Sequence, residues 1–256
     1  MSGDKQQRIQ HYQRVYREEY GFESVLVAAR QELLLDLLAR HAPAVVVEVG
    51  CGADPLCERV KSAGLQVDRW IIVEPADEFI EIARSAAHAA SNLFVVSGFI
   101  EDVVGEVMAL CPNPPDLVIC SGLLHEVPDV GKVLMAVHDL LQGGGLLHAS
   151  VPNALSMHRR LARIMGLIAD EKELSERNKA LAQFRVFDPN SLSESVVSSG
   201  FTIEEQGGHF LKPFTHAQMQ AIRPILTPGI LDGLFRLGRE LPELASEIFV
   251  NARVRK

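Results

Sequence analysis

The stretch VVVEVGCGA at residues 45–53 carries most of the information about the fold of this chain. Its first five residues, four of them valine, predict a short buried strand that ends before Gly50. Gly50 and Gly52 then let bare backbone approach a ligand, since side chains at these positions would collide with it. A tight turn between a strand and a helix would use the same glycines, so the pattern alone is weak evidence for a ligand site.

Strand-like and helix-like segments alternate around this stretch. We expect further strands at 70–73, 93–97, 116–120, 146–151, 201–205 and 246–254. We expect helices at 23–41, 54–64, 77–90, 101–110, 129–142 and 188–199. Strands separated by helices predict a doubly wound, mostly parallel α/β sheet, because each crossover must return along one face. Ligands of such sheets bind outside the carboxyl ends of the strands.

Two mostly helical insertions, at 154–187 and 215–243, interrupt the alternation. The chain of 256 residues is therefore expected to form one domain, 1–256. Residues 1–44 would be an N-terminal cover, residues 45–153 the ligand-binding core, and the insertions a lid over the site.

Composition and charge exclude several classes of protein. The chain has 33 acidic and 25 basic residues and a net charge of −8, which disfavours nucleic acid and anionic membranes as partners. It has no apolar run of the roughly 18 residues that span a bilayer, and a polar N-terminus unlike a signal peptide. Its four cysteines form no disulfide framework, and its histidines lack metal-ligand spacing. We expect a cytoplasmic protein without a metal.

A second carboxylate sharpens the prediction of a ligand site. Glu74 ends the second predicted strand, 22 residues after Gly52, where a carboxylate can accept hydrogen bonds from ribose hydroxyls. Pro55 stands where a dinucleotide-binding fingerprint has its third glycine. The pattern therefore favours a nucleoside ligand without a pyrophosphate.

Five stretches together resemble the class I S-adenosylmethionine (SAM) dependent methyltransferases. They are VVVEVGCGADP (45–55), IIVEPADEFIEIAR (71–84), VVSGFIEDV (95–103), PDLVICSGLLHEVPD (115–129) and LLQGGGLLHASVPN (140–153). They follow the order of that family. The resemblance implies a Rossmann-like seven-stranded sheet whose last strand is antiparallel, with SAM as cofactor and S-adenosylhomocysteine (SAH) as product.

The resemblance also implies a cofactor site. Its residues would be Glu48, Gly50, Cys51, Gly52, Glu74, Pro75, Phe99, Ile100, Glu101, Cys120, Ser121 and Gly122. The glycine loop would pack against the methionine part of SAM, and Glu48 would hold that loop and the amino group. Glu74 would bind the ribose, residues 99–102 would frame the adenine, and residues 120–122 would line the floor near the methyl group.

The adenine region departs from the family pattern. Phe99 stands where many relatives have an aspartate that binds the adenine amino group. Adenine recognition would then depend on backbone groups of Ile100 and on Glu101. The charge of Glu101 is equally explained as ordinary helix N-terminal charge.

His125 follows the fourth predicted strand and should lie at the ligand edge of the sheet. A hydroxyl acceptor must lose a proton during methyl transfer, and histidine titrates in a suitable range. We therefore consider His125 a candidate general base. A structural hydrogen bond beneath the following helix is the alternative.

Several residues are candidates for acceptor binding. Asn153, His158 and Arg159 leave the fifth strand at the same edge, although an ordinary helix start explains them equally well. Tyr20 ends a stripe with Tyr12 and Tyr16 on a predicted N-terminal helix, which in this family commonly covers the pocket. Lys212 and His216, which follow the sixth strand, are weaker candidates.

We expect a SAM-dependent methyltransferase that acts on a small molecule, by O-methylation of a sugar or a secondary metabolite. A nicotinamide-dependent oxidoreductase on a similar sheet and a non-catalytic SAM-binding protein are the alternatives. Apolar residues of the second insertion would serve either as core or as the face of a homodimer. They are Ile225, Leu226, Ile230, Leu231 and Leu234.

Overall fold

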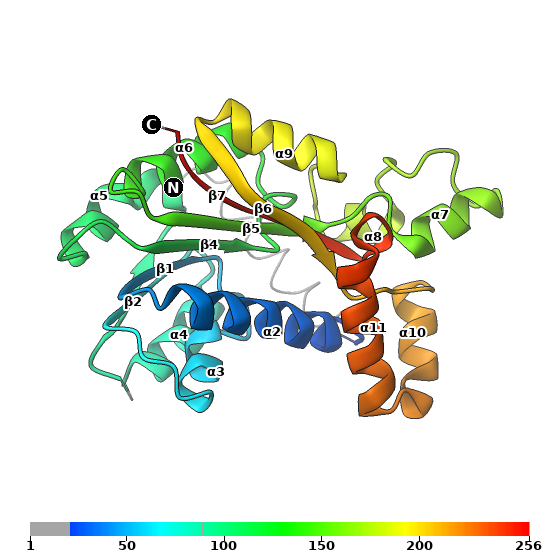
Figure 1. Cartoon of the computed structure of the whole chain (residues 1–256), viewed down its shortest axis with the longest axis horizontal. Coiled ribbons are helices and arrows are strands. Elements are labelled where there is room, and N and C mark those ends of the chain that lie inside the picture. Colours follow the sequence, from blue (N-terminus) through cyan, green and yellow to red (C-terminus); the bar gives the residue numbers. More distant parts are fainter. Residues whose placement is uncertain (1–20, 89, 256) are drawn as a thin grey trace.

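The computed structural model describes residues 21–88 and 90–255. Seven strands form one sheet in the order β3-β2-β1-β4-β5-β7-β6 (Figure 1). The strands are β1 (Val45–Val49), β2 (Arg69–Glu74), β3 (Leu93–Ser97), β4 (Leu117–Ser121), β5 (Leu146–Pro152), β6 (Phe201–His209) and β7 (Glu247–Val254). Strands β1 to β5 are parallel, and β7 is antiparallel to both of its neighbours, β5 and β6. The predicted sheet with an antiparallel last strand is confirmed.

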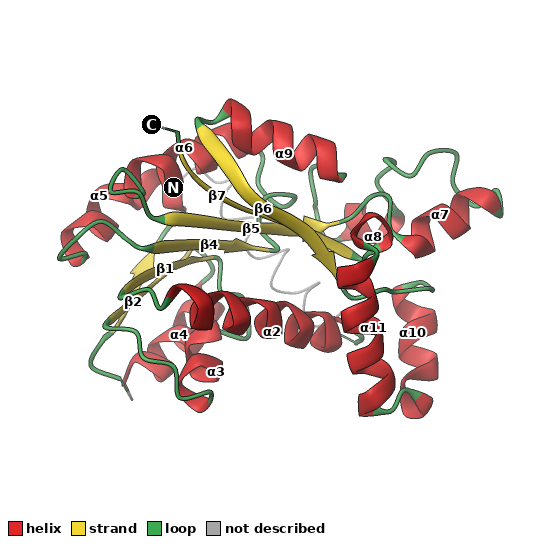
Figure 2. Ribbon diagram, viewed as in Figure 1, coloured by secondary structure: helices red, strands yellow, loops and turns green. Residues whose placement is uncertain are grey.

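Helices cover both faces of the sheet (Figure 2). One face packs against α2 (Glu23–His41), α3 (Leu56–Ser62) and α4 (Asp77–His88). The opposite face packs against α5 (Ile100–Leu110), α6 (Val130–Leu140) and α9 (Pro189–Ser198). Alternate residues of the parallel strands belong to opposite clusters, as Val46 and Val47 do, because side chains of a strand alternate between its faces. The strands therefore read as continuous apolar runs.

Local signals in the sequence fix where the helices begin and end. The carboxylate of Asp129 accepts a hydrogen bond from the backbone N–H of Lys132 at 3.1 Å, which begins α6. Asp188 caps α9 in the same way, and Pro189 occupies the first helical position. Gly64, with φ of +72°, follows the end of α3. These bounds lie within about two residues of the predicted ones.

Strand β6 is longer than predicted. We expected it to end at residue 205, but it continues to His209 through two glycines. A Cβ at Gly207 would lie 2.9 Å from the ring of Phe249, and one at Gly208 would lie 2.6 Å from Cβ of Ala245. The glycines thus permit close packing against β7 and against the segment that precedes it. Pairing with β7 outweighs their low strand propensity.

The first insertion is less helical than predicted. Residues 154–187 contain only two short helices, α7 (Met157–Ile164) and α8 (Glu176–Ala180). Gly166, with φ of +72°, ends the turn after α7, and Ser175 caps α8. The second insertion contains α10 (His216–Ile222) and α11 (Pro228–Glu240) with two short 3-10 helices, η1 (Arg223–Ile225) and η2 (Pro242–Leu244).

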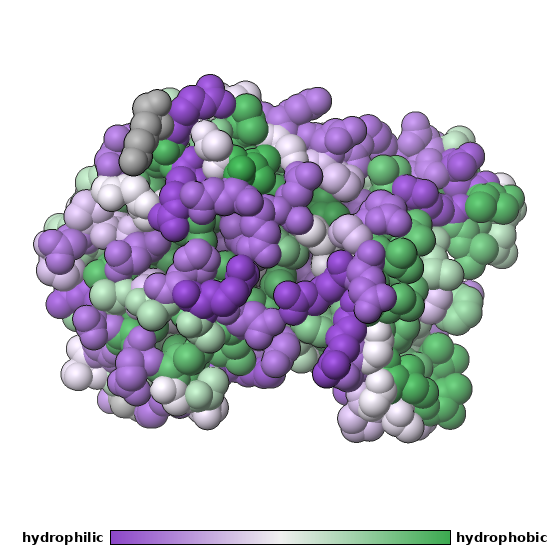
Figure 3. Space-filling view, viewed as in Figure 1, coloured by the Kyte–Doolittle hydropathy of each residue, from purple (hydrophilic) through white to green (hydrophobic). Residues whose placement is uncertain are grey.

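Both insertions lie beyond the carboxyl ends of the parallel strands, on the right of Figure 1. Leu226, Leu231 and Leu234 pack against a cluster that contains Phe22 and Phe210. Other large apolar side chains of the insertions are exposed, and apolar surface gathers over α7 and α10 in Figure 3. They include Ile164, Met165, Leu167, Ile225 and Ile230. The homodimer stays a prediction.

Candidate active site

A cavity of about 580 Å³ lies at the carboxyl ends of β1, β2, β4 and β5, where the switch in strand order places ligands of such sheets. Its walls come from these strand ends, from α2 and from both insertions. Its volume falls in the range typical of small-molecule sites. Most of the site residues predicted from the sequence line this cavity, together with other residues that the sequence did not indicate.

The glycine loop forms one wall of the cavity. Gly50 and Gly52 have φ angles of +75° and +60°, a conformation that L-residues with side chains rarely adopt. No atom would lie within 4 Å of a Cβ at Gly52, so this backbone faces open space. The N–H of Gly50 donates to the carbonyl of Val73 at 2.9 Å, which ties the loop to β2. Cys51 lines the cavity between the two glycines.

Glu48 holds this loop from below. One carboxylate oxygen accepts a hydrogen bond from the backbone N–H of Leu56 at 3.1 Å, and the other from the indole N–H of Trp70 at 2.9 Å. Burial raises the pKa of Glu48 to about 7. The contacts show a residue that ties β1 to the start of α3. Each oxygen already has a protein donor, so these contacts support the part of the prediction that concerns the loop.

Glu74 lies at the end of β2 beside the same loop. Its carboxylate accepts hydrogen bonds from the backbone N–H of Ala76 at 3.0 Å and from that of Gly52 at 3.3 Å. Burial raises the pKa of Glu74 to about 7. Pro75 lines the cavity next to it. A buried carboxylate with spare acceptor capacity suits a pair of ribose hydroxyls.

The remaining predicted cofactor residues divide into two groups. Five line the cavity at the ends of β3 and β4, namely Phe99, Ile100, Glu101, Ser121 and Gly122. Cys120 does not, and this prediction is corrected. Its side chain is fully buried in the core beneath α6, because it shares a strand face with Val118. The next residue, Ser121, faces the opposite side of the sheet, where its hydroxyl lies 3.1 Å from that of Ser150.

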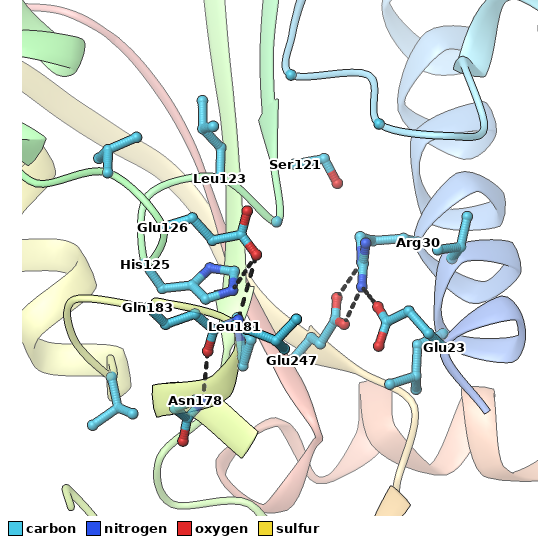
Figure 4. Close-up of a pocket in the computed structure, with 18 of the residues that line it drawn as sticks. Glu23, Arg30, Ser121, Leu123, His125, Glu126, Asn178, Leu181, Gln183 and Glu247 are labelled. Carbon is cyan, nitrogen blue, oxygen red and sulfur yellow. Dashed lines mark hydrogen bonds and ion pairs between the residues drawn. The ribbon is translucent and has the colours of Figure 1, made fainter. Parts of the chain in front are cut away.

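An ion-pair network that the sequence did not reveal forms the wall opposite His125 (Figure 4). Arg30 of α2 donates to both carboxylate oxygens of Glu247 at 2.7 Å and to Glu23 at 2.6 Å. Burial alone would raise the pKa of Glu247, but attraction to Arg30 and to His209 lowers it to about 2. Burial would also raise the pKa of Glu23, but His216 and Arg30 lower it, so both carboxylates are ionised at neutral pH. The network ties α2 to β7.

This network predicts a large effect on stability. Replacing Arg30 with methionine leaves the buried carboxylate of Glu247 and the half-buried one of Glu23 without their common partner, so we expect the free energy of unfolding to fall by about 3–5 kcal/mol. Urea denaturation measures it. The control is Arg239→Met, whose exposed pair with Asp36 should contribute at most about 1 kcal/mol. Equal losses in both variants would show that the Arg30 network adds no more than a surface pair.

His125 lies across the cavity and is 5% exposed (Figure 4). Its Nε2 lies 3.5 Å from a carboxylate oxygen of Glu126, and Glu126 accepts a hydrogen bond from Gln183 at 3.4 Å. Among the described residues, none hydrogen-bonds to Nδ1 of His125. Burial and the charge of Arg30 lower the pKa of His125 to about 4. The imidazole is neutral at physiological pH and can accept a proton.

The predicted acceptor residues also line the cavity, but two of them bind the backbone of the protein. Asn153 is buried, donates to the carbonyls of Glu243 and Ala245, and accepts from the N–H of Leu155. Its side chain therefore supports the loop after β5. The guanidinium of Arg159 donates to the carbonyls of Glu171 and Glu173 and holds the segment between α7 and α8.

His158, Lys212 and His216 also line the cavity, although the last two were the weaker sequence candidates. They come from α7, from the segment after β6 and from the start of α10. Tyr20, with Tyr12 and Tyr16, lies outside the described residues.

Comparison with known proteins decides the family. A family model described as a methyltransferase domain matches residues 18–206, which is most of the chain. This chain is a member of that methyltransferase family. A ubiquinone biosynthesis O-methyltransferase of Xylella fastidiosa is 28% identical over 185 residues, covering 70% of this chain and 71% of the relative. The methyltransferase uses SAM as its methyl donor.

Solved structures show the same fold. A SAM-dependent methyltransferase from Mesorhizobium loti has a TM-score of 0.57 at 18% identity and covers 88% of this chain and 97% of its own. The plantazolicin methyltransferase BamL, solved with a substrate analogue and SAH, has a TM-score of 0.58 at 12% identity and covers 98% of each chain. The match to the methyltransferase family overturns the alternative of a nicotinamide-dependent oxidoreductase.

The cavity of this methyltransferase fits SAM at its glycine-loop end. The open backbone at Gly52 offers room that a side chain would fill, and Glu74 presents a carboxylate for hydroxyl donors. Bound SAM supplies an electrophilic methyl group on a sulfonium. Gly50, Gly52 and Glu74 would hold it, and Phe99 to Glu101 would border it at the end of β3.

Glu74 gives a direct test of this assignment. We expect Glu74→Gln to weaken SAH binding by about 10- to 100-fold, because an amide loses the charge and one of the acceptor oxygens. Calorimetric titration with SAH measures the change. Glu81→Gln, an exposed change on the neighbouring α4, is the control and should bind like the wild type. Wild-type affinity in Glu74→Gln would show that the ribose lies elsewhere.

Two searches of the described residues complete the site. Over residues 21–88 and 90–255, no helix is long and apolar enough to cross a membrane. Within the same ranges, no three His, Cys, Asp or Glu side chains form a group that could hold a metal ion.

Proposed function

We propose that this methyltransferase transfers the methyl group of SAM to a hydroxyl oxygen of a small molecule, a sugar or a secondary metabolite. The observation that carries the proposal is the neutral, buried imidazole of His125 on the wall of the cofactor cavity. An amine acceptor can attack with its own lone pair, whereas a hydroxyl gains from a base that takes its proton. The O-methyltransferase from Xylella fastidiosa adds support from a relative.

In this proposal the proton moves to Nε2 of His125, because Nδ1 is fully buried and out of reach of an acceptor in the cavity. Nε2 lies 3.5 Å from a carboxylate oxygen of Glu126, and the neutral tautomer that carries its hydrogen on Nδ1 leaves Nε2 as the acceptor. The carboxylate of Glu126 would then stabilise the imidazolium. Gln183, which donates to Glu126, and Asn178, which donates to Gln183 at 2.5 Å, hold this carboxylate in place.

The two insertions would shape the acceptor end of the cavity. Residues of α7, α8 and α10 line it, together with Leu167 and Leu181 from the connecting segments. A lid that excludes water favours an in-line displacement at a sulfonium, because it aligns the acceptor and prevents hydrolysis. In this proposal α2 and the two insertions together enclose the acceptor.

The test is product analysis with paired acceptors. The protein is incubated with SAM and with compounds that offer a hydroxyl, an amine or a nucleophilic carbon as acceptor, and SAH release is measured. Mass spectrometry and NMR then locate the methyl group. The control for each hydroxyl compound is its O-methyl ether, which should release no SAH. Methyl transfer to nitrogen or carbon only would overturn the proposal, and SAH binding without turnover on any acceptor would favour a non-catalytic role.

A further inference from the structure

The end of the cavity formed by the two insertions carries an unusual buried lysine. Lys212 lies between β6 and α10, is only 6% exposed and lines the cavity. Its ammonium lies 3.3 Å from Nδ1 of His216. An ammonium offers three donors, and this contact uses one of them. Among the described residues, no carboxylate pairs with it at ion-pair distance.

The charges of two carboxylates, Glu23 and Glu247, act on Lys212, but both carboxylates already pair with other groups. Glu23 pairs with Arg30 at 2.6 Å and lies 3.3 Å from Nε2 of His216. Glu247 pairs with Arg30 at 2.7 Å and lies 3.3 Å from Nε2 of His209. A buried cation without its own counter-ion is costly, so proteins normally retain one only where something else compensates it.

Further basic groups converge on the same end of the cavity. His158 and Arg159 come from α7, and Arg177 comes from α8. Burial lowers the pKa of His158, and the charges of Lys212, Arg159 and His216 lower it further. Burial lowers the pKa of Lys212 to about 8, which leaves it mostly protonated at neutral pH. This local excess of basic groups contrasts with the net charge of −8 of the whole chain.

We propose that Lys212, held in place by His216 and assisted by His158, binds an oxyanion of the acceptor, a carboxylate or a phosphate ester. The oxyanion would accept hydrogen bonds from the remaining N–H groups of the ammonium and supply its missing counter-charge. The inference rests on the proposed function, because it assigns this end of the cavity to the acceptor. It places the anionic group at the insertion end and the hydroxyl to be methylated toward His125.

The test uses small probes that carry only the recognised group. Benzoate, phenyl phosphate and neutral benzamide are titrated into the SAH-loaded protein at constant ionic strength, with calorimetry as the readout. We expect benzoate or phenyl phosphate to bind at least about tenfold more tightly than benzamide, the effect of one charge-assisted hydrogen bond. Whichever anion binds more tightly identifies the chemistry as carboxylate or phosphate.

Variants assign the preference to Lys212. Lys212→Met should remove it while retaining SAH binding, and Lys212→Arg should keep part of it. Lys132→Met, at an exposed position on α6, is the control and should behave as the wild type. Equal binding of the three probes, no binding of any of them, or a preference that survives Lys212→Met would overturn the inference.

The two proposals fail separately. Methyl transfer to hydroxyl compounds without any preference for anionic ones would leave the proposed function intact and remove the oxyanion site. Tight, Lys212-dependent anion binding with methyl transfer to nitrogen would do the reverse.

Discussion

Gly50→Arg should abolish cofactor binding, with a loss of SAH affinity of at least about 100-fold, or about 2.8 kcal/mol. Gly50 adopts φ of +75° on the wall of the cavity, and a Cβ there would already lie 3.2 Å from Cδ1 of Leu123. The longer arginine side chain must enter the space beside the loop, where the cofactor binds. Calorimetric titration with SAH measures the loss.

Gly64→Arg is the matched control for this variant. Gly64 has φ of +72°, so both substitutions impose the same backbone strain, about 1–2 kcal/mol. No atom lies within 4 Å of a Cβ at Gly64, and the residue lies outside the cavity. The control should lose stability in thermal denaturation but keep its SAH affinity. If Gly50→Arg also kept wild-type affinity, the glycine loop would not contact the cofactor.

The residues that line the glycine-loop end of the cavity were predictable because their signals are local. Gly50, Gly52 and Glu74 each follow or end a buried apolar strand, and the topology of a parallel sheet brings such ends to one edge. The valine-rich stretch at 45–49 predicted both ends of β1 correctly. Cys120 shows what such signals miss when the strand face is ignored. The two-residue period from Val118 would have placed its side chain in the core.

The contacts at the other end of the cavity were not predictable, because they join distant parts of the chain. Arg30 and Glu247 are 217 residues apart, and neither has a neighbour in sequence that signals a buried partner. An arginine on an amphipathic helix normally indicates a solvated face. The functions of Asn153 and Arg159 depend on where the connecting loops run, since both side chains bind backbone carbonyls of those loops. Loop paths follow from packing and leave no periodic pattern.

The length of β6 illustrates the same limit within the fold. Gly207 and Gly208 are expected to break a strand, yet they are required by close contacts with Phe249 and Ala245, which lie 42 and 37 residues further along the chain (249 − 207 and 245 − 208). A local propensity predicts such positions wrongly whenever the partner strand is remote in sequence. The antiparallel order of β6 and β7 itself came from the family resemblance, since spacing alone does not fix it.

His125→Ala should slow methyl transfer to a hydroxyl acceptor by about 10²- to 10⁴-fold while changing SAH affinity little, because the variant removes the base and leaves the glycine loop intact. Single-turnover rates with saturating SAM, compared with SAH titration, separate the two effects. An unchanged rate would make His125 a structural residue.

His148→Ala is the matched control for loss of a buried imidazole. His148 is 1% exposed, its pKa is also lowered to about 4 by burial, and its Nδ1 lies 2.8 Å from Oδ1 of Asn251 within the sheet. Since it lies outside the cavity, its removal should lower stability and leave the rate per folded molecule unchanged. An equal rate loss in both variants would assign the effect to folding.

The pH dependence gives an independent check on His125. Its pKa in the folded protein, about 4, lies below the ordinary value of 6.5, so the imidazole is neutral and able to accept a proton at every pH well above 4. Glu74, whose pKa is about 7, affects cofactor binding in this range, so the rate is measured with saturating SAM. Lowering the pH through 6.5 should then leave the rate per folded molecule unchanged, and protonation of His125 should reduce it only as the pH approaches 4. A rate that halves near pH 6.5 in the wild type, and loses that dependence in His125→Ala, would show a solvated imidazole instead of the buried one.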